Sequence, residues 1–598
     1  MVSRLVYTPV RHSHLITTFG PGALSVTENG VTVLTSGPRT WLRSYRMERP
    51  LLNETIDDLT IRDSYMETRL GVHRIVAPWP LSEDPSTKSD WLIPAVRFPL
   101  AEFCRNAKCR RMHWSDQGDW KIGQCNVCTT RRGKKPPTTQ VPIVLACQNG
   151  HLSDVPWSSW VHDGSECGQA ILRYRQNASP RRPTVDCLTC GRSRTMGDQE
   201  SFACSGARPW LPGLAPEDCQ LNAQLVERSS TSIYFADTAS SLAIPPVAGI
   251  RPVILRHFRN SAALRQLRAV YTSGNQLVLD QMASVCALLG VETDAQEVAL
   301  HLDALALEEV QVQAADEDEI RSRELDALLS SRPRVGRGKG QPDLIVEPIE
   351  MTRFADAPLM SRISAVSVIP RLREIQVLKG FSRINPVNRS PAEGYAQMWG
   401  APQIDEELQC GAGWLPGYEV FGEGILVELD STAWRNWVFD NRESARIHDH
   451  ALYPDGLHPE RVLVHTLAHL VIRAAAPLSG YSQPSIRERI YDHDGRLAFL
   501  IYTTVGDIEG TMGGLASLGQ PGRLEALMTT VVEMAAWCTT DPVCIESSPP
   551  PGLPTTTKAG ACHHCLLLPE TSCEIHNRRL DRAVVIGTPD DDCGFLVD

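Results

Sequence analysis

The sequence predicts a multidomain α+β protein: a β-rich N-terminal part, zinc-ribbon-like modules, a helical middle, and an α/β C-terminal domain with a four-cysteine zinc site. Three observations predict this class. The chain has 598 residues, 42% apolar and 22% charged, an ordinary composition for several globular domains. Of its 18 cysteines, 15 fall within residues 104–219 and 538–573. The hydrophobic period changes from strand-like near the N-terminus to helical in the middle.

The setting of the cysteines favours metal binding over disulfides. The N-terminus lacks the apolar segment of a signal peptide, and no run of 18 uninterrupted apolar residues predicts a membrane-spanning helix. Long chains without a secretion signal use clustered cysteines as metal ligands more often than as disulfides. We therefore expect an intracellular protein that holds zinc and does not contact a membrane.

Changes in composition divide the chain into five regions. Residues 31–35 are strand-like and bounded by glycines, whereas apolar residues recur at three- and four-residue steps over 262–271, 276–290 and 295–329. Strand-like runs follow at 363–370, 374–378 and 423–429. The expected regions are 1–100 (β-rich), 101–225 (cysteine-rich and zinc-binding), 226–342 (helical and acidic, ending in a basic linker), 343–460 (α/β) and 461–598 (four-cysteine zinc domain).

The most specific metal signal begins the cysteine-rich region. Cys104-x4-Cys109 and Cys125-x2-Cys128 have the spacing of two zinc-ribbon knuckles, in which paired thiolates bind one tetrahedral ion. Seven further candidate ligands follow, one short of two full sites: Cys147, His151, Cys167, Cys187, Cys190, Cys204 and Cys219. We expect Cys187, Cys190, Cys204 and Cys219 to share an ion, with the other three forming a degenerate or borrowed-ligand site. His151 is as well explained by a turn after Asn149-Gly150 as by ligation.

Charge is distributed unevenly along a chain whose formal net charge is −11. Residues 101–200 contain 15 Lys and Arg against 9 Asp and Glu, whereas residues 291–330 contain 2 against 12. Basic side chains pair with phosphates and tryptophan faces stack on bases, so the first segment is a candidate DNA contact. The candidate contact residues are Arg131, Arg132, Lys134 and Lys135. A solvated basic surface, with the tryptophans in small metal-stapled cores, is the alternative.

A second cysteine cluster lies near the C-terminus. Cys562-x2-Cys565 and Cys573 predict three ligands of a structural zinc site, and either Cys538 or Cys544 supplies the fourth. We assign Cys544 to that position.

Catalytic motifs are sparse. His465-x3-His469 has the helical spacing of zincin proteases, but Thr466 stands where those enzymes have their glutamate base. No Gly-x4-Gly-Lys-Ser/Thr loop occurs, which argues against an ATPase. We therefore expect no catalytic residues. The alternative is a metal-dependent nuclease or hydrolase that uses histidines and carboxylates between residues 465 and 514, among them Asp507 and Glu509.

Two sets of motifs resemble a known family. Cys538 to Cys544, Ala561 to Cys573 and Asn577 to Asp581 resemble the four-cysteine domain that ends MrfA-type DNA-repair helicases, here without a fused helicase. The remaining motifs are similar to the DrmB family of stand-alone subunits of DISARM anti-phage systems: Thr17 to Ala23, Cys147 to His151 with Pro156-Trp157, Arg371 to Glu374, Gly380 to Arg383, and Val420 to Ile425.

The resemblance implies a function that composition and spacing do not. It implies a non-catalytic subunit of an antiviral defence complex in the bacterial cytoplasm. The implied partner is a helicase subunit similar to DrmA, through which the chain would engage DNA. A scaffold without nucleic-acid contact remains a third possibility.

Overall fold

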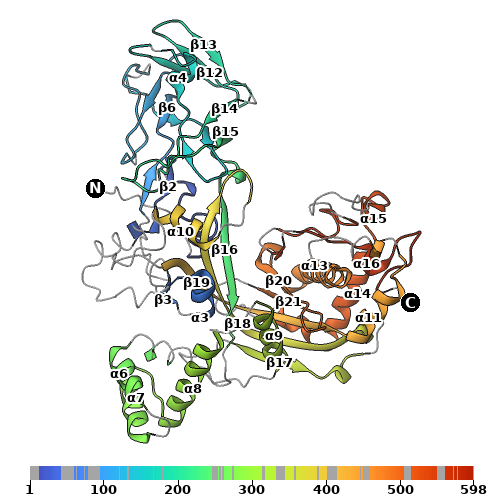
Figure 1. Ribbon diagram of the computed structural model, residues 1–598. Coiled ribbons are helices and arrows are strands. Elements are labelled where there is room, and N and C mark those ends of the chain that lie inside the picture. Colours follow the sequence, from blue (N-terminus) through green and yellow to red (C-terminus); the bar gives the residue numbers. More distant parts are fainter. Residues whose placement is uncertain are drawn as a thin grey trace. The chain divides into compact units, whose positions relative to one another are not determined.

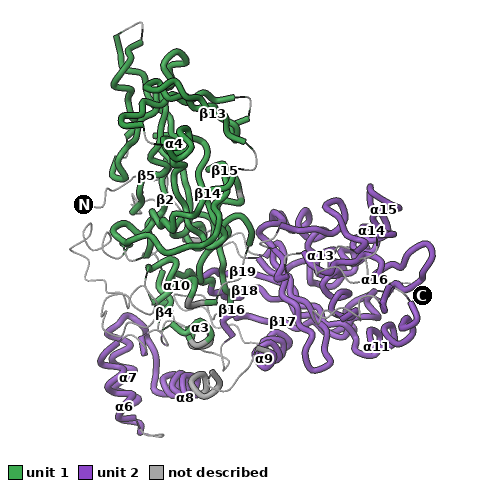
Figure 2. The backbone as a smooth tube through the Cα atoms, turned by 45° about the horizontal axis from the view of Figure 1, so that its top comes forward, with its two compact units in different colours: residues 1–240, 376–418 green, residues 241–375, 419–598 purple. Residues whose placement is uncertain are grey.

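The computed structural model divides into two compact units, shown as ribbons in Figure 1 and in two colours in Figure 2. Unit 1 comprises residues 1–240 and 376–418, and unit 2 comprises residues 241–375 and 419–598. The five regions expected from composition stay a prediction. The structure describes residues 12–27, 29–38, 40–41, 60–61, 63–72, 74–77, 94–119, 121–130, 133–165, 167–177, 179–197, 200–244, 254, 257–258, 261–271, 275–312, 317–330, 344–355, 359–386, 390–400, 414–444, 446–448, 458–503, 513–547, 559–569, 572–575 and 577–596.

Unit 1 begins with short strands and turns, as its alternation and glycine–proline motifs predict. Its first sheet is antiparallel in the order β1-β2-β5. The elements of this part are α1 (His12–Ile16), β1 (Leu24–Val26), β2 (Thr32–Thr35), β3 (Thr60–Ile61), α3 (Ser64–Leu70), β4 (Arg74–Val76) and β5 (Ala95–Arg97). The strand expected at residues 31–35 is β2.

The cysteine-rich part of unit 1 contains three small sheets, in the orders β7-β6-β8, β10-β9-β15-β14 and β11-β12-β13. They share an apolar core that includes Trp157, Trp160 and Tyr174, so these aromatic residues fill the interior between the cysteine clusters. The elements are β6 (Ala101–Cys104), β7 (Met112–Trp114), β8 (Thr138–Gln140), β9 (Ile143–Ala146), β10 (Leu152–Ser153), α4 (Trp157–Val161), β11 (Leu172–Arg175), β12 (Thr184–Cys187), β13 (Ser193–Thr195), β14 (Ser201–Ala203) and β15 (Asn222–Glu227).

Two long strands, β18 (Ile363–Ser382) and β19 (Trp414–Leu429), contribute residues to both units. The sequence predicted two strands where β18 is continuous. Arg373, between the two predicted strands, is paired with Glu419 of β19 at 2.6 Å, so its charge is compensated within the sheet. Strand β16 (Phe235–Leu242), which also has residues in both units, lies beside β18, and α10 spans Pro391–Trp399 in unit 1.

Unit 2 is built around a buried helix, α13 (Pro459–Ser479), which packs on β20 (Ile486–Tyr491), β21 (Ala498–Thr503) and α14 (Arg523–Ala536). Strand β21 pairs antiparallel with both β19 and β20. Helix α13 is apolar and long enough to cross a membrane, but 78% of its apolar window is buried, as in the core helix of a globular domain. The other elements here are β17 (Ile345–Ile349), α11 (Ser431–Asp440), α15 (Val543–Glu546) and α16 (Ala583–Ile586).

The helices expected in the middle of the chain are present. They are α6 (Ala262–Val270), α7 (Gln276–Leu288), α8 (Ala295–Val312) and α9 (Glu317–Leu329). Side chains cap two of them: Ser261 accepts a hydrogen bond from the Leu264 amide, and Asn275 accepts one from the Val278 amide. Leu264, Met282 and Leu302 belong to one shared core, so α6, α7 and α8 form a small helical subdomain.

A buried arginine joins three distant loops of unit 1. Arg383, at 0% exposure, donates hydrogen bonds to the carbonyl oxygens of Gly22 (2.7 Å), Gly150 (2.8 Å) and Ile233. Its guanidinium also lies over Trp210 and the Phe381 ring. Burial lowers the pKa of Arg383 to about 9, which leaves the side chain charged at neutral pH. Three of the motifs singled out in the sequence therefore meet at one cation.

Replacing Arg383 with Met should destabilise unit 1. Three buried carbonyls would lose their donor, and leaving buried acceptors unsatisfied costs roughly 3 kcal/mol or more in total. Hydrogen exchange measured by mass spectrometry should show faster exchange in peptides around Gly22 and Gly150. The exposed Arg182→Met variant is the control. Unchanged protection in Arg383→Met would contradict the assigned role.

Candidate metal centres

Tetrahedral coordination sets the distances expected between ligand atoms. With Zn–S bonds of about 2.3 Å and Zn–N bonds of about 2.0 Å, the edges of the tetrahedron are about 3.8 Å between sulfurs and about 3.5 Å between sulfur and nitrogen. Five groups of four side chains in the described residues have all their ligand atoms within 4.8 Å of one another. Three groups belong to unit 1 and two to unit 2.

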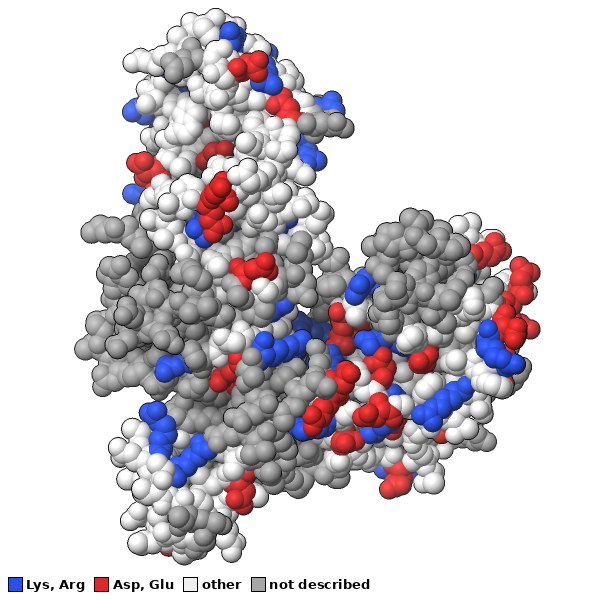
Figure 3. Space-filling view, in the orientation of Figure 1, with Lys and Arg blue, Asp and Glu red and all other residues white. Residues whose placement is uncertain are grey.

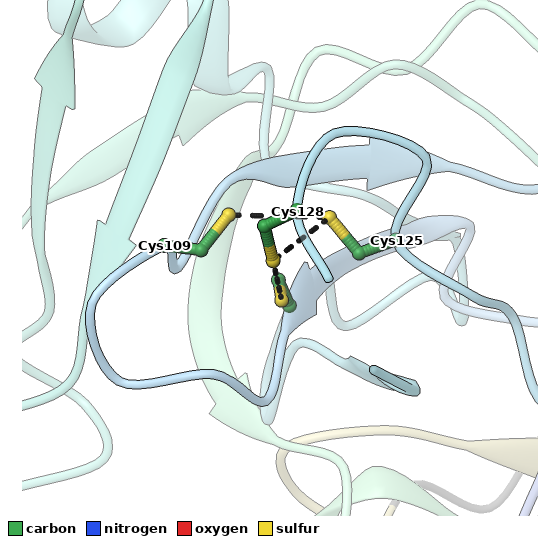
Figure 4. Close-up of side chains that lie close together, drawn as sticks. Cys109, Cys125 and Cys128 are labelled. Carbon is green, nitrogen blue, oxygen red and sulfur yellow. Dashed lines mark hydrogen bonds between the residues drawn. The ribbon is translucent and has the colours of Figure 1, made fainter. Parts of the chain in front are cut away.

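The first centre joins Cys104, Cys109, Cys125 and Cys128, the four residues that the ribbon spacing brought together in the sequence. Sulfur–sulfur distances are 3.6 Å for Cys104–Cys128, 3.9 Å for Cys109–Cys125 and 3.8 Å for Cys125–Cys128. Figure 4 shows the sulfurs of the three labelled cysteines turned toward one another from neighbouring turns. These distances match the edges of a sulfur tetrahedron.

The second centre joins Cys147, His151, Cys204 and Cys219. Nδ1 of His151 lies 3.4 Å from the Cys147 sulfur and 3.5 Å from the Cys204 sulfur. Its other nitrogen, Nε2, lies 2.8 Å from a Glu217 carboxylate oxygen. A ligating histidine commonly donates its second N–H to a carboxylate, which fixes the tautomer and the ring orientation. The geometry therefore favours His151 as a ligand over a turn residue.

The third centre contains a residue that sequence reasoning missed. His162 lies with Cys167, Cys187 and Cys190, its Nε2 3.3 Å from the Cys190 sulfur. Its Nδ1 is 2.7 Å from the Ser158 carbonyl oxygen, and this hydrogen bond on the side away from the cysteines orients the ring. The spacing His162-x4-Cys167 was the available signal.

The structure groups the seven candidate ligands differently from the partition predicted from the sequence. Cys187 and Cys190 do not lie with Cys204 and Cys219, because β12 and the turn after it carry the first pair to the end of α4, where His162 lies. Cys204 and Cys219 lie in the connection between β14 and β15 and meet the turn between β9 and β10 instead.

The fourth centre joins Cys538, Cys544, Cys562 and Cys565, with sulfur–sulfur distances of 3.4 Å (Cys538–Cys562), 3.7 Å (Cys544–Cys565) and 3.7 Å (Cys562–Cys565). The sequence left Cys538 and Cys544 as alternatives, and the structure places both in this group. Cys573, which the sequence grouped with these cysteines, lies apart from them in a cluster with His465, His469 and Glu488.

The surroundings of the first cysteine in each C-x2-C turn lower the pKa of its thiol. Burial by itself would raise the pKa of Cys125, but hydrogen bonds from the backbone N–H groups of Val127 and Cys128 outweigh it and lower the pKa to about 6. The pKa of Cys187 is about 6 for the same reasons, with the amides of Cys190 and Thr189 as donors. Because a metal binds the thiolate, this turn geometry favours metal binding over a neutral thiol.

The basic residues between the centres differ in their surroundings. Lys134 and Lys135 are exposed, and the part of the chain that the structure describes shows no ion pair for either; Arg131 and Arg132 lie outside it. Arg173 and Arg175 instead pair with Asp186 at 2.9 and 2.7 Å. Burial raises the pKa of Asp186, but hydrogen bonds from Arg175, Ser193 and Arg173 outweigh it and keep the pKa below its usual range. On the face drawn in Figure 3, blue and red residues are interspersed on each unit.

The proposed hydrolase residues do not form an open site in the described residues. His465 and His469 are at most 1% exposed. A catalytic metal needs a coordination position that substrate or water can reach. Asp507 and Glu509 lie outside the described residues.

The fold and these centres define a protein whose small sheets and C-terminal helical core are held by several cysteine and histidine clusters of metal-binding geometry. Residues 467–566, which include all four cysteines of the fourth centre, match the MrfA Zn-binding domain. Residues 11–235, which contain the first three centres, match a domain of unknown function, DUF8724.

One relative extends over most of the chain. It is the DISARM protein DrmB of Bacillus paralicheniformis, 27% identical over 544 residues, which is 85% of this chain and 91% of the relative. Together with the Zn-binding domain match, this similarity confirms the resemblance predicted from the sequence motifs.

The grouping of ligands in unit 1 predicts that two double variants differ in the number of metal ions they hold. Cys190→Ser and Cys204→Ser remove ligands from two different centres, so the double variant should hold two metal ions fewer than the wild-type chain. Cys187→Ser with Cys190→Ser should hold one fewer, because both belong to one centre. Metal is counted by mass spectrometry of the digested protein.

Cys286→Ser is the matched control, because Cys286 is buried in α7 and outside each of the five groups. It should keep the wild-type count. Equal losses in the two double variants would contradict the partition described here.

Proposed function

We propose that this chain is a zinc-stapled, non-catalytic subunit of a DISARM-type anti-phage defence complex in the bacterial cytoplasm. Similarity to DISARM protein DrmB over 85% of the chain is the observation that carries this proposal. The match of residues 467–566 to a Zn-binding domain supports zinc as the metal.

The centres support a structural role for the metal. Each offers four protein ligands, and Zn²⁺ in structural sites is four-coordinate with cysteine and histidine ligands. No position then remains for a reacting water. The proposed metal ligands are those of the four centres described above, with His162 and Cys538 added to the residues expected from sequence; Cys573 is considered separately below.

The partner in this proposal is a helicase subunit similar to DrmA. The described chain has no phosphate-binding loop of the Walker type, so strand separation would depend on a second protein that hydrolyses ATP. Co-expression with the product of a neighbouring helicase gene, followed by affinity purification, should recover a stable complex. Purification of the chain alone, with the helicase present but not retained, would overturn this part of the proposal.

The proposed DNA contact is the basic turn that follows the first centre. The Thr130 amide donates to the Lys134 carbonyl at 2.7 Å and the Gly133 amide donates to the Thr130 carbonyl at 2.9 Å, so the turn is closed by its own backbone. Gly133 has a φ of +74°, and this favours glycine at that position. A fixed turn reduces the entropy lost when its lysines meet phosphates.

Neutralising the turn should weaken DNA binding. In the variant Arg131→Gln, Arg132→Gln, Lys134→Gln, Lys135→Gln, each lost phosphate contact should reduce the slope of log affinity against log salt by about 0.7 to 0.9. Binding of the chain, alone and with its helicase, to single- and double-stranded DNA is measured by fluorescence anisotropy at several salt concentrations.

A charge-matched control removes four exposed arginines of unit 2 by Arg265→Gln, Arg442→Gln, Arg523→Gln and Arg578→Gln. It should retain the wild-type slope. If both variants bind DNA like the wild type, the turn is only a solvated loop and the DNA contact lies elsewhere. If the wild-type chain neither binds DNA nor changes DNA binding by its helicase, the scaffold function without DNA contact is favoured. Cleavage of DNA by the purified chain with Mg²⁺ would favour the hydrolase alternative.

A further inference from the structure

The fifth cluster lies inside unit 2 and contains His465, His469, Glu488 and Cys573. Helix α13 supplies the two histidines one turn apart, β20 supplies the glutamate, and the segment after the fourth centre supplies the cysteine. His465 and His469 have exposures of 1% and 0%, and Glu488 and Cys573 have exposures of 2% and 6%. His465 and Cys573 lie outside the residues that match the Zn-binding domain.

The ligand atoms converge on one point. Nε2 of His465 lies 3.0 Å from Oε1 of Glu488 and 3.3 Å from the Cys573 sulfur. Nε2 of His469 lies 3.4 Å from Oε2 of Glu488. For bonds of about 2.0 Å to nitrogen and oxygen, a tetrahedral edge is about 3.3 Å, and about 3.5 Å when one ligand is sulfur. The three distances are within about half an ångström of these edges.

The hydrogen bonding of His469 leaves a lone pair directed into this cluster. Its Nδ1 is 2.9 Å from the Leu566 carbonyl oxygen, which can only accept, so Nδ1 carries the proton. In the neutral ring Nε2 is then an acceptor, and it faces a carboxylate oxygen, which is also an acceptor. Neither Nε2 of His469 nor Oε2 of Glu488 has a hydrogen-bond partner, although both atoms are buried. Two buried acceptors facing each other need a proton or a metal ion between them.

Neighbouring backbone groups support the remaining ligands. The Asn577 amide donates to the Cys573 sulfur at 3.2 Å, and the Glu574 amide donates to Oε1 of Glu488 at 3.2 Å. Both bonds favour the anionic form that a metal requires. His465 lacks such support, since its Nδ1 has no hydrogen-bond partner, and its ring is positioned by the surrounding core alone.

We propose that His465, His469, Glu488 and Cys573 form a fifth metal centre that binds a divalent transition metal, with zinc the ion that best fits one sulfur, two nitrogen and one oxygen ligands. One divalent ion, one carboxylate, one thiolate and two neutral imidazoles have a net charge of zero. A neutral group of this kind is compatible with full burial. All four ligands come from protein, so the centre is structural.

This centre would tie the core helix to the fourth centre. Leu566, whose carbonyl holds His469, directly follows Cys565 of the four-cysteine group. Two ions would then fix the same segment from both sides. The inference does not depend on the proposed DNA or helicase contacts.

The metal content of the full chain tests the proposal. After expression with zinc supplied, the wild-type protein should hold five ions per chain, and Glu488→Gln should hold four. Glu423→Gln is the control: Glu423 is also a buried glutamate of unit 2, but it accepts backbone hydrogen bonds from Leu515 and Gly513 outside every cluster, so five ions should remain.

Additivity distinguishes a separate centre from the four-cysteine group. Cys538→Ser and Cys573→Ser should each remove one ion, and the double variant should remove two. A loss of only one ion in the double variant would place Cys573 in the fourth centre and overturn the proposal.

A second measurement uses only the wild-type protein, so it tests the proposal even if the variants fail to fold. Anomalous diffraction from wild-type crystals at the zinc absorption edge should show a peak between His465, His469, Glu488 and Cys573. Peaks at the other four centres with none at this position would mean that the cluster is a metal-free, proton-linked network.

Discussion

The close spacing of thiols and imidazoles, a geometry suited to coordinating a cation, is the constraint on which the rest of this structure depends. Ligand atoms within 4.8 Å of one another repel when the thiols ionise, unless a cation lies between them. In unit 1, three such groups hold sheets of three or four strands whose shared core is small. Metal binding and folding are therefore expected to be coupled in this part of the chain, since a preformed site is absent when the chain is unfolded.

Buried arginine side chains also join segments that are distant in sequence, away from the metal-binding clusters. Arg383 satisfies the carbonyls of Gly22, Gly150 and Ile233, each of which lies 150 or more residues from it in sequence. In unit 2, Arg446 and Asp581 form a buried pair at 2.6 Å, and Arg489 pairs with Glu324 at 2.5 Å. A buried charge is costly without such partners, so these pairs favour the contacts between the segments that they join.

The two units use their metal-binding clusters differently. In unit 1 the clusters lie at the ends of hairpins and join neighbouring turns, as in Cys104 to Cys128. In unit 2 the cluster around Glu488 lies against the buried helix α13, where apolar residues already supply a core. An ion there would hold the segment after Cys565 against α13. It would not have to compensate for a small apolar core.

The sequence by itself determined which clustered cysteines could be ligands and, where spacing was short, which of them could share an ion. Cys104 to Cys128 and Cys562-x2-Cys565 were predicted in this way because a tight turn brings near neighbours together. It also predicted the helices from 262 to 329 and, from motifs, the resemblance to DrmB. Only the tertiary structure decided how ligands distant in sequence are shared. Cys187 lies with His162 rather than with the predicted Cys204 and Cys219. Cys573 lies with two histidines and Glu488 rather than with the predicted cysteines, and no spacing rule connects Glu488, a strand residue, to them. The physical reason is that strand pairing and helix packing, rather than sequence separation, fix the distances between these side chains.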